Sequence, residues 1–169
     1  MIVSYLDFKA GKYELHTGMY DQARIQDYID LYEKPYLIKL LGAELFDEFE
    51  ADFIAGIGIP TEVRFQKILN PFHEDYNFQV IISEGMKEML LGLIYFEYAK
   101  DLSNQMTNNG LVKPVGENSK NISSLNAMYY TRFNRSVRTW RAIQCFIYAV
   151  KSEDYSNRNG QPLQYAYWI

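Results

Sequence analysis

Four arginines form the most regular chemical pattern in the chain. Arg132, Arg135, Arg138 and Arg141 recur at every third position within a stretch of helical character. Because an α-helix turns by about 100° per residue, positions three apart drift by ~60° at each step, so the side chains spiral as two neighbouring pairs. Such a basic ridge suits either nucleic acid or an acidic patch on a neighbouring protein. Pairing within the chain, with the acidic helix described next, is an equally good interpretation.

Carboxylates concentrate in one short segment upstream of the ridge. They are Glu44, Asp47, Glu48, Glu50 and Asp52, and the first three share a helix face. Paired carboxylates can carry acid–base chemistry or hold a hard cation. No cationic residue lies next to them in the sequence to tune a pKa, so a solvated acidic face is the favoured interpretation.

Histidine and cysteine chemistry is sparse. His16 and His73 are the two histidines, and neither has a histidine or cysteine partner at metal-ligand spacing. Cys145 lies in a strongly apolar helical stretch, which predicts a buried, inert thiol. Gly56 and Gly58 lack the strand, the further glycines and the Lys-Ser/Thr pair of a phosphate-binding loop. The sequence therefore predicts no catalytic site, no metal site and no cofactor.

The composition is that of a single globular domain. The chain has 169 residues, of which 48% are hydrophobic and 22% charged, and its net charge is −4. This length suffices for a core without disulfides, and the acidic balance argues against a protein that wraps nucleic-acid phosphates. Residues 1–12 do not resemble a signal peptide, and the most apolar run, 89–98, is far shorter than the ~20 residues of a membrane span. A soluble protein is expected.

The apolar periodicity predicts a mainly α fold, an antiparallel bundle of about four to five helices over residues 20–154. Residues 1–19 are predicted as a strand or an extended arm. The first helix begins at Asp21 as N-cap. Pro35 either ends that helix or sets the first turn of the next, which Gly42 stops.

The remaining helices follow from apolar stripes. One stripe covers residues 45–53, and a short helix over 61–69 has Thr61 as its cap. Two long helices are predicted over 78–103 and 122–153, each with a broad apolar face.

The connection between the two long helices, residues 104–121, is rich in Asn, Gly, Ser and Lys. A connection of this length in a compact domain is usually functional. We expect it to project from the bundle and to contact an adjacent subunit through Leu111, Val112 and Val115.

The C-terminal segment, residues 155–169, is unusually aromatic. Its large apolar residues are Leu163, Tyr165, Tyr167, Trp168 and Ile169. Chain ends are usually polar and frayed unless something holds them, so we interpret this segment as a docking tail, able to add a strand to a partner's sheet. The alternative is that the tail folds back onto its own bundle.

Three segments resemble the head–tail connector (adaptor ring) family of tailed bacteriophages, in the form found in phages of Bacteroidetes, including crAss-like phages. They are residues 28–46 (YIDLYEKPYLIKLLGAELF), residues 92–101 (GLIYFEYAKD) and residues 104–113 (NQMTNNGLVK). The resemblance covers roughly residues 20–150 and includes no catalytic signature.

The resemblance implies a structural virion protein without enzymatic activity. Its subunits would form a closed ring of twelve copies beneath the portal protein, and the ring would carry the tail or a second adaptor ring protein. Genomic DNA would pass through the lumen without sequence recognition, and assembly would take place in the cytoplasm of the host bacterium. The acidic helix and the arginine ridge could supply the two different patches that a ring interface requires.

Other functions remain as alternatives. A tail-completion or tail-terminator protein belongs to the same class. A small DNA-packaging (terminase) subunit would also be helical and ring-forming, but it should carry a helix-turn-helix and a basic domain. A helical-bundle enzyme would need a convergent pocket of acids or histidines, which the sequence does not suggest.

Overall fold

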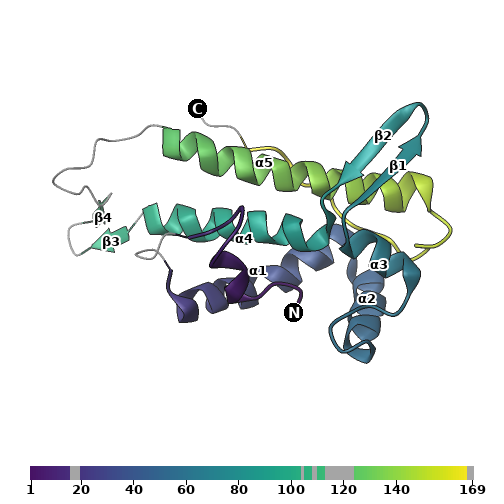
Figure 1. The fold of residues 1–169 in the computed structure, drawn as a ribbon, viewed down its shortest axis with the longest axis horizontal. Coiled ribbons are helices and arrows are strands. Elements are labelled where there is room, and N and C mark those ends of the chain that lie inside the picture. Colours follow the sequence, from purple (N-terminus) through teal and green to yellow (C-terminus); the bar gives the residue numbers. More distant parts are fainter. Residues whose placement is uncertain (16–19, 104, 108–109, 113–123, 167–169) are drawn as a thin grey trace.

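The structure has the mainly α architecture expected from the sequence. This computed structural model describes residues 1–15, 20–103, 105–107, 110–112 and 124–166. The elements run, in chain order, η1 (Tyr5–Phe8), α1 (Gln22–Leu41), α2 (Ala43–Ala55), α3 (Val63–Leu69), β1 (Phe72–Tyr76), β2 (Gln79–Ser83), α4 (Gly85–Ser103), β3 (Gln105–Thr107), β4 (Gly110–Val112), α5 (Ser124–Cys145) and η2 (Phe146–Val150). Helix α4 lies antiparallel to α1 and to α5 (Figure 1).

Helix α4 is the centre of the domain. Its buried residues are Met86, Met89, Leu90, Leu91, Leu93, Ile94, Tyr95, Phe96, Tyr98 and Ala99. Because these positions point in every direction around the axis, the helix needs cover on all sides. Helices α1, α3 and α5 all contact it. Gly92 allows α4 and α5 to approach each other closely, since a Cβ atom at Gly92 would lie 2.0 Å from the Ser136 hydroxyl oxygen.

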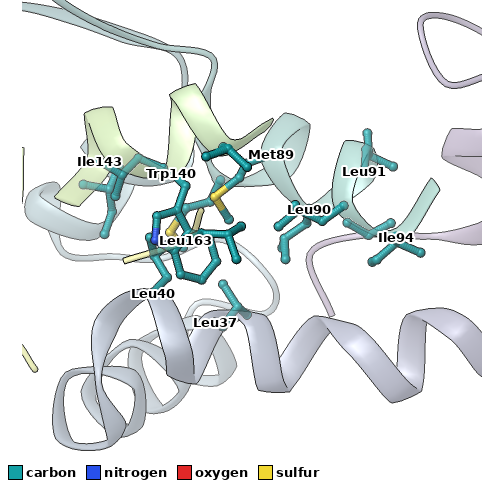
Figure 2. Packing of buried hydrophobic residues seen from close by; sticks show 14 of the residues in the cluster. Leu37, Leu40, Met89, Leu90, Leu91, Ile94, Trp140, Ile143 and Leu163 are labelled. Atoms are coloured by element: carbon teal, nitrogen blue, oxygen red, sulfur yellow. The ribbon is translucent and has the colours of Figure 1, made fainter. Parts of the chain in front are cut away.

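The core is continuous across three helices and the C-terminal segment. Figure 2 shows side chains from α1, α4, α5 and residue 163 packed around the indole of Trp140, which is fully buried. The labelled members are Leu37, Leu40, Met89, Leu90, Leu91, Ile94, Trp140, Ile143 and Leu163.

Helix α1 begins where predicted and continues past the predicted break. Asp21 is the N-cap, and its carboxylate accepts a hydrogen bond from the Arg24 amide at 3.2 Å. The expectation that the helix breaks at Pro35 was wrong, because α1 runs unbroken to Leu41. Pro35 removes the hydrogen bond to the carbonyl of Leu31. Both residues are exposed, so water can reach that carbonyl.

Helices α2 and α3 confirm the two short helices expected before residue 70. The apolar stripe of α2 is buried and includes Leu45, Phe46 and Phe49. Thr61 is not the cap of α3, since the N-cap position is Glu62. The Thr61 hydroxyl instead donates a hydrogen bond to the carboxylate of Asp52.

A β-hairpin replaces the beginning of the helix predicted over 78–103. Strands β1 and β2 pair antiparallel across two residues, Asn77 and Phe78. Their φ angles are 48° and 63°, and a type I′ turn requires positive values at both positions. Glycine usually occupies the second position of such a turn. Because Phe78 occupies it here, the sequence did not indicate a turn. Helix α4 starts only at Gly85.

The N-terminal segment packs against the bundle. A strand or an extended arm was predicted here, but Tyr5–Phe8 forms a 3₁₀ helix in which Ser4 and Asp7 make a capping box. The buried side chains of the segment are Val3, Phe8, Tyr13 and Leu15. Among the described residues it has no neighbouring strand, so a helical turn satisfies its backbone locally.

The last long helix and the connection before it differ from the prediction. Helix α5 is shorter than the predicted 122–153, and it passes at Phe146 into a π-helix over five residues. Before it, β3 and β4 form a small hairpin beyond the end of α4 (Figure 1). Leu111 and Val112 lie in β4 and Val115 lies outside the described residues, so their role as anchors stays a prediction.

Residues 159–161 close the C-terminal end of α1. The Asn159 amide donates to the carbonyl of Leu41 at 3.0 Å, and the Gln161 amide donates to the carbonyl of Lys39 at 2.7 Å. The last carbonyls of a helix have no partner within it. The C-terminal segment supplies these partners, and it is thereby part of the fold.

We predict that Gly42→Ala destabilises the protein more than Gly11→Ala. The two glycines have φ of 89° and 91°, but a Cβ atom at Gly42 would lie 2.6 Å from the amide nitrogen of Asn159, while one at Gly11 meets nothing within 4 Å. Backbone strain costs ~1–3 kcal/mol, and overpacking adds ~1–3 kcal/mol at Gly42 alone. Urea unfolding measures both losses. Equal losses would contradict a tight closure of α1 by residues 159–161.

Candidate interaction surface

The outer face of the β1–β2 hairpin carries exposed apolar side chains beside two polar ones, Asp75 and His73, which lie opposite Val80 and Ile82 in the neighbouring strand. Phe78, Val80 and Ile82 define this hairpin face; Phe78 is fully exposed and the other two are at least 59% exposed. They alternate with Ile81 and Ser83, which point towards the bundle and are more buried. Side chains two apart on a strand share one face. Val80 and Ile82 therefore share the outer face of β2, and Phe78 is exposed in the turn that precedes the strand.

A second apolar surface lies where α2 connects to α3. We name Ile54, Ile57, Ile59 and Val63 the isoleucine loop; each is between 67% and 94% exposed. Ile57, the most exposed of them, has a φ of 55°, which β-branched residues rarely adopt.

The charged groups around the isoleucine loop are satisfied within the chain. Asp52 accepts hydrogen bonds from Thr61 and from the Glu62 amide, which lower the pKa of its carboxyl. Arg64 pairs with Glu62 at 2.5 Å and with Glu48 at 3.0 Å. A molecule that covered the loop would not leave these charges without partners.

The two apolar surfaces project on opposite sides of the same end of the bundle. In Figure 1 the hairpin rises above α5, and α2 with its following loop extends in the opposite direction, below α1 and α4. Full burial of a Val, Ile or Phe side chain is worth ~1.5–3 kcal/mol. Clusters of exposed apolar side chains mark contact sites more often than scattered ones do.

The arginine ridge is engaged largely within its own chain. Arg135 contacts the Glu84 carboxylate through Nε at 2.6 Å and Nη2 at 2.5 Å, and Lys12 binds the same carboxylate at 3.1 Å. Burial of Glu84 would raise the pKa of its carboxyl, but the hydrogen bonds from Arg135 and Lys12 outweigh this effect and lower it. This is the intramolecular alternative, although the partner is Glu84 and not the acidic helix.

Two further arginines of the ridge stack on tyrosines. Arg132 lies over the ring of Tyr95 at 4.7 Å, and Arg141 lies over the ring of Tyr165 at 4.2 Å. Arg138 is exposed and makes no ion pair with any described residue. Of the four, Arg138 is therefore the one best able to pair with a second molecule.

The acidic helix is only partly available. Glu48 is taken up by Arg64 and by the side-chain amide of Asn157. Glu44 and Asp47 are exposed on the outer face of α2 and, within the described part of the chain, form no ion pair. The predicted acidic face thus reduces to these two carboxylates.

The described part of the C-terminal tail folds back onto its own bundle. Leu163 is 9% exposed, so its interpretation as a docking residue is corrected. The indole nitrogen of Trp140 donates to the carbonyl of Gln161 at 3.1 Å, and the side chain of Asn134 exchanges two hydrogen bonds with the backbone of Ala166. These bonds bind the tail along α5.

The remaining aromatic residues of the tail divide into two cases. Tyr165 is half-buried beneath Arg141 and is likewise not free to dock. Tyr167, Trp168 and Ile169 lie outside the described residues, so their docking role stays a prediction.

The other candidate groups gather into no chemical centre in the described ranges. His73 is exposed on β1, and His16 lies outside the described residues. Cys145 is half-buried, whereas a buried thiol was expected. No three His, Cys, Asp or Glu side chains of the described residues come together as a metal site. None of the described helices combines the length and the apolar character of a bilayer span.

An apolar groove of about 430 Å³ lies between the N-terminal residues, α1 and α2. Glu33, at its wall, is 6% exposed, and its carboxylate accepts hydrogen bonds from the amides of Ile2 and Val3, both at 2.9 Å. Burial raises the pKa of Glu33, and the two backbone hydrogen bonds offset part of this rise. The Glu33 carboxylate thus binds the N-terminal segment at one side of the groove, where Val3 is also buried in the core.

Sequence reasoning did not find the hairpin face or the isoleucine loop. For the loop a signal was present, because the stretch from Ile54 to Pro60 places isoleucines among glycines, where no helix can bury them. For the hairpin, the apolar residues over 78–82 were assigned to a helix. Comparison of the chain with family models, with curated proteins and with solved structures found no match.

We predict that Leu163→Ala lowers the melting temperature of the isolated protein. Removing a nearly buried leucine costs ~2–4 kcal/mol through lost burial and the cavity that remains. Gln164→Ala, at the exposed neighbouring position, is the control and should leave the melting temperature unchanged. A Leu163→Ala protein as stable as the control would show that the tail is not part of the folded core.

A second prediction concerns the pH dependence that Glu33 contributes. In the folded state, the pKa of the Glu33 carboxyl is raised above its ordinary 4.5. Between pH 4.5 and this raised pKa, the folded state therefore holds more protons than the unfolded state. The free energy of unfolding should therefore fall as pH rises through that window. Glu33→Gln should lack this decrease, and Asp27→Asn, at an exposed position of α1, should retain it. Urea unfolding at a series of pH values tests this, and parallel profiles for the native chain and Glu33→Gln would refute it.

Proposed function

We propose that the chain is a structural subunit of a phage head–tail connector ring, which joins the portal to the tail and has no catalytic role. The observation that carries the proposal is the pair of apolar surfaces, the hairpin face and the isoleucine loop, on opposite sides of one end of the bundle. The resemblance of residues 28–46, 92–101 and 104–113 to connector proteins gives the class of assembly.

A ring makes a specific demand on its subunits. Each copy must present two different, complementary surfaces, because a rotation that joins copies head to tail brings one surface against the other. Two copies related by a twofold axis would need only one self-complementary surface. A chain with two apolar surfaces facing away from each other fits the first arrangement better.

The proposal also accounts for the satisfied charges. Obligate interfaces are more apolar at their centre, and charged groups are depleted there. Around the isoleucine loop, the carboxylates and Arg64 are already bonded within the chain. The surface can lose water without a new ion partner.

The proposal predicts assembly. At high concentration, or with the portal protein present, the purified full-length chain should form rings that are visible by negative-stain electron microscopy and have a defined mass by sedimentation. Leu31→Ser, which replaces an exposed apolar residue of α1 outside both surfaces, is the control and should assemble normally.

Two outcomes would overturn the connector proposal. One is a chain that stays monomeric at all concentrations and does not bind portal protein. The other is a purified chain that carries a stoichiometric nucleotide or metal, since a purely structural subunit needs neither.

A further inference from the structure

We infer that the solvent-facing side of α5 contacts the phosphate backbone of duplex DNA without reading its sequence. We name this side, which carries Arg132, Arg135, Arg138 and Arg141, the α5 face. The inference rests on the proposed function and adds to it the side of the subunit that would line the lumen of the ring. It is carried by the distribution of charge and does not depend on the two apolar surfaces.

Helix α5 concentrates positive charge in an otherwise acidic protein. Its 22 residues include four arginines and no aspartate, glutamate or lysine. Subtracting these four charges from the net charge of −4 leaves −8 for the rest of the chain. Such a molecule repels a polyanion over most of its surface and attracts it at one helix, so the charge itself orients the contact.

The elements packed against α5 add little negative charge to this face. Strand β2 contacts α5 and contains no charged residue. Residues 159–166, which run along α5, contain none either. On α4, Glu97 and Asp101 accept hydrogen bonds from Tyr36 and Tyr28 of α1, so these carboxylates are directed towards α1.

One of the four arginines is neutralised within the chain, and three keep their charge. Arg135 pairs with Glu84. The other three form no ion pair in the part of the chain that the structure describes; they are Arg132, Arg138 and Arg141. Two of these stack on tyrosine rings, a contact that leaves the positive charge in place. The α5 face therefore has three positive charges without a counterion, spread over about 14 Å of helix.

The surroundings of these charges favour nucleic acid over an acidic protein surface. Protein interfaces centre on aromatic and apolar side chains and place charged groups at the rim. Among the described residues of α5, Met128 alone is a large apolar side chain that is exposed, and it lies near one end of the helix. Contacts to phosphate need no such anchor, because the guanidinium donates directly to phosphate oxygens. Duplex DNA carries a phosphate about every 1.7 Å of its axis, so a short row of arginines finds partners in any register.

The salt dependence of DNA binding tests the α5 face. The probe is a short fluorescein-labelled duplex of mixed sequence, and its anisotropy is measured with the purified full-length chain over a series of low salt concentrations. Each phosphate contact adds about 0.9 to the slope of log K against log salt concentration. Arg138→Gln should therefore weaken binding and reduce the slope by about 0.9, whereas Arg138→Lys should keep the slope, because a phosphate also accepts a point charge.

The matched control is Lys34→Gln, which removes the same charge from an exposed position of α1. Helix α4 lies between α1 and α5 in Figure 1, so this substitution should leave the slope unchanged. All three variants should melt at the temperature of the native chain, because both positions are exposed.

Three results would overturn the inference. The first is a duplex that does not bind even at low salt, and the second is an equal slope for the native chain and Arg138→Gln. The third is a polyglutamate peptide, with as many charges as the duplex, that binds as tightly as the duplex or more tightly; the α5 face would then meet an acidic protein.

The same measurements separate this inference from the proposed function. If the duplex does not bind through α5 but the chain forms rings, the connector proposal stands and only the side that faces DNA is wrong. If the duplex binds through α5 but no rings form with or without portal protein, the connector proposal fails and the α5 face remains a DNA-contacting surface.

Discussion

The burial of α4 on every side is the constraint on which the rest of the fold depends. Its apolar residues point all around the helix axis, so a single partner helix could not cover them. α1 and α5 flank it, α3 contacts it, and Tyr13 of the N-terminal segment packs on Tyr95 at a ring distance of 5.8 Å. The peripheral segments thus have fixed positions because the central helix must be kept from water.

The same requirement explains why the C-terminal segment is part of the domain. The end of α1 lies against the core, where its last carbonyl groups need partners from the protein. Residues 159–161 supply two amides, and Gln144 of α5 donates to the carbonyl of Leu40 at 3.4 Å. The segment then continues along α5, where Trp140 holds the carbonyl of Gln161. The described aromatic residues of this segment, Tyr155 and Tyr165, pack against the core.

Helical periodicity predicted the helices, and it failed where a single residue decides the backbone. Asp21 begins α1 as expected. Gly42 was expected to stop a second helix after Pro35, but it ends α1 itself, because Pro35 does not break the helix where the lost hydrogen bond faces water. The hairpin was missed because its turn carries phenylalanine in place of glycine. Whether a proline or a turn residue is tolerated depends on solvent exposure, which only the tertiary structure sets.

The charged residues could be recognised from the sequence, but their partners could not. Arg135 pairs with Glu84, 51 residues away, and this contact exists only because α5 packs beside the end of β2. The apolar surfaces were hidden for the same reason, since exposure is a property of the fold. Each surface also includes a residue with a strained backbone. Ile57 and Phe78 are the two most exposed large apolar side chains among the described residues, and both have positive φ, which costs a non-glycine residue ~1–3 kcal/mol. Glycine at either position would relieve the strain and remove the exposed apolar group together. The chain instead carries isoleucine and phenylalanine there, and both side chains face solvent.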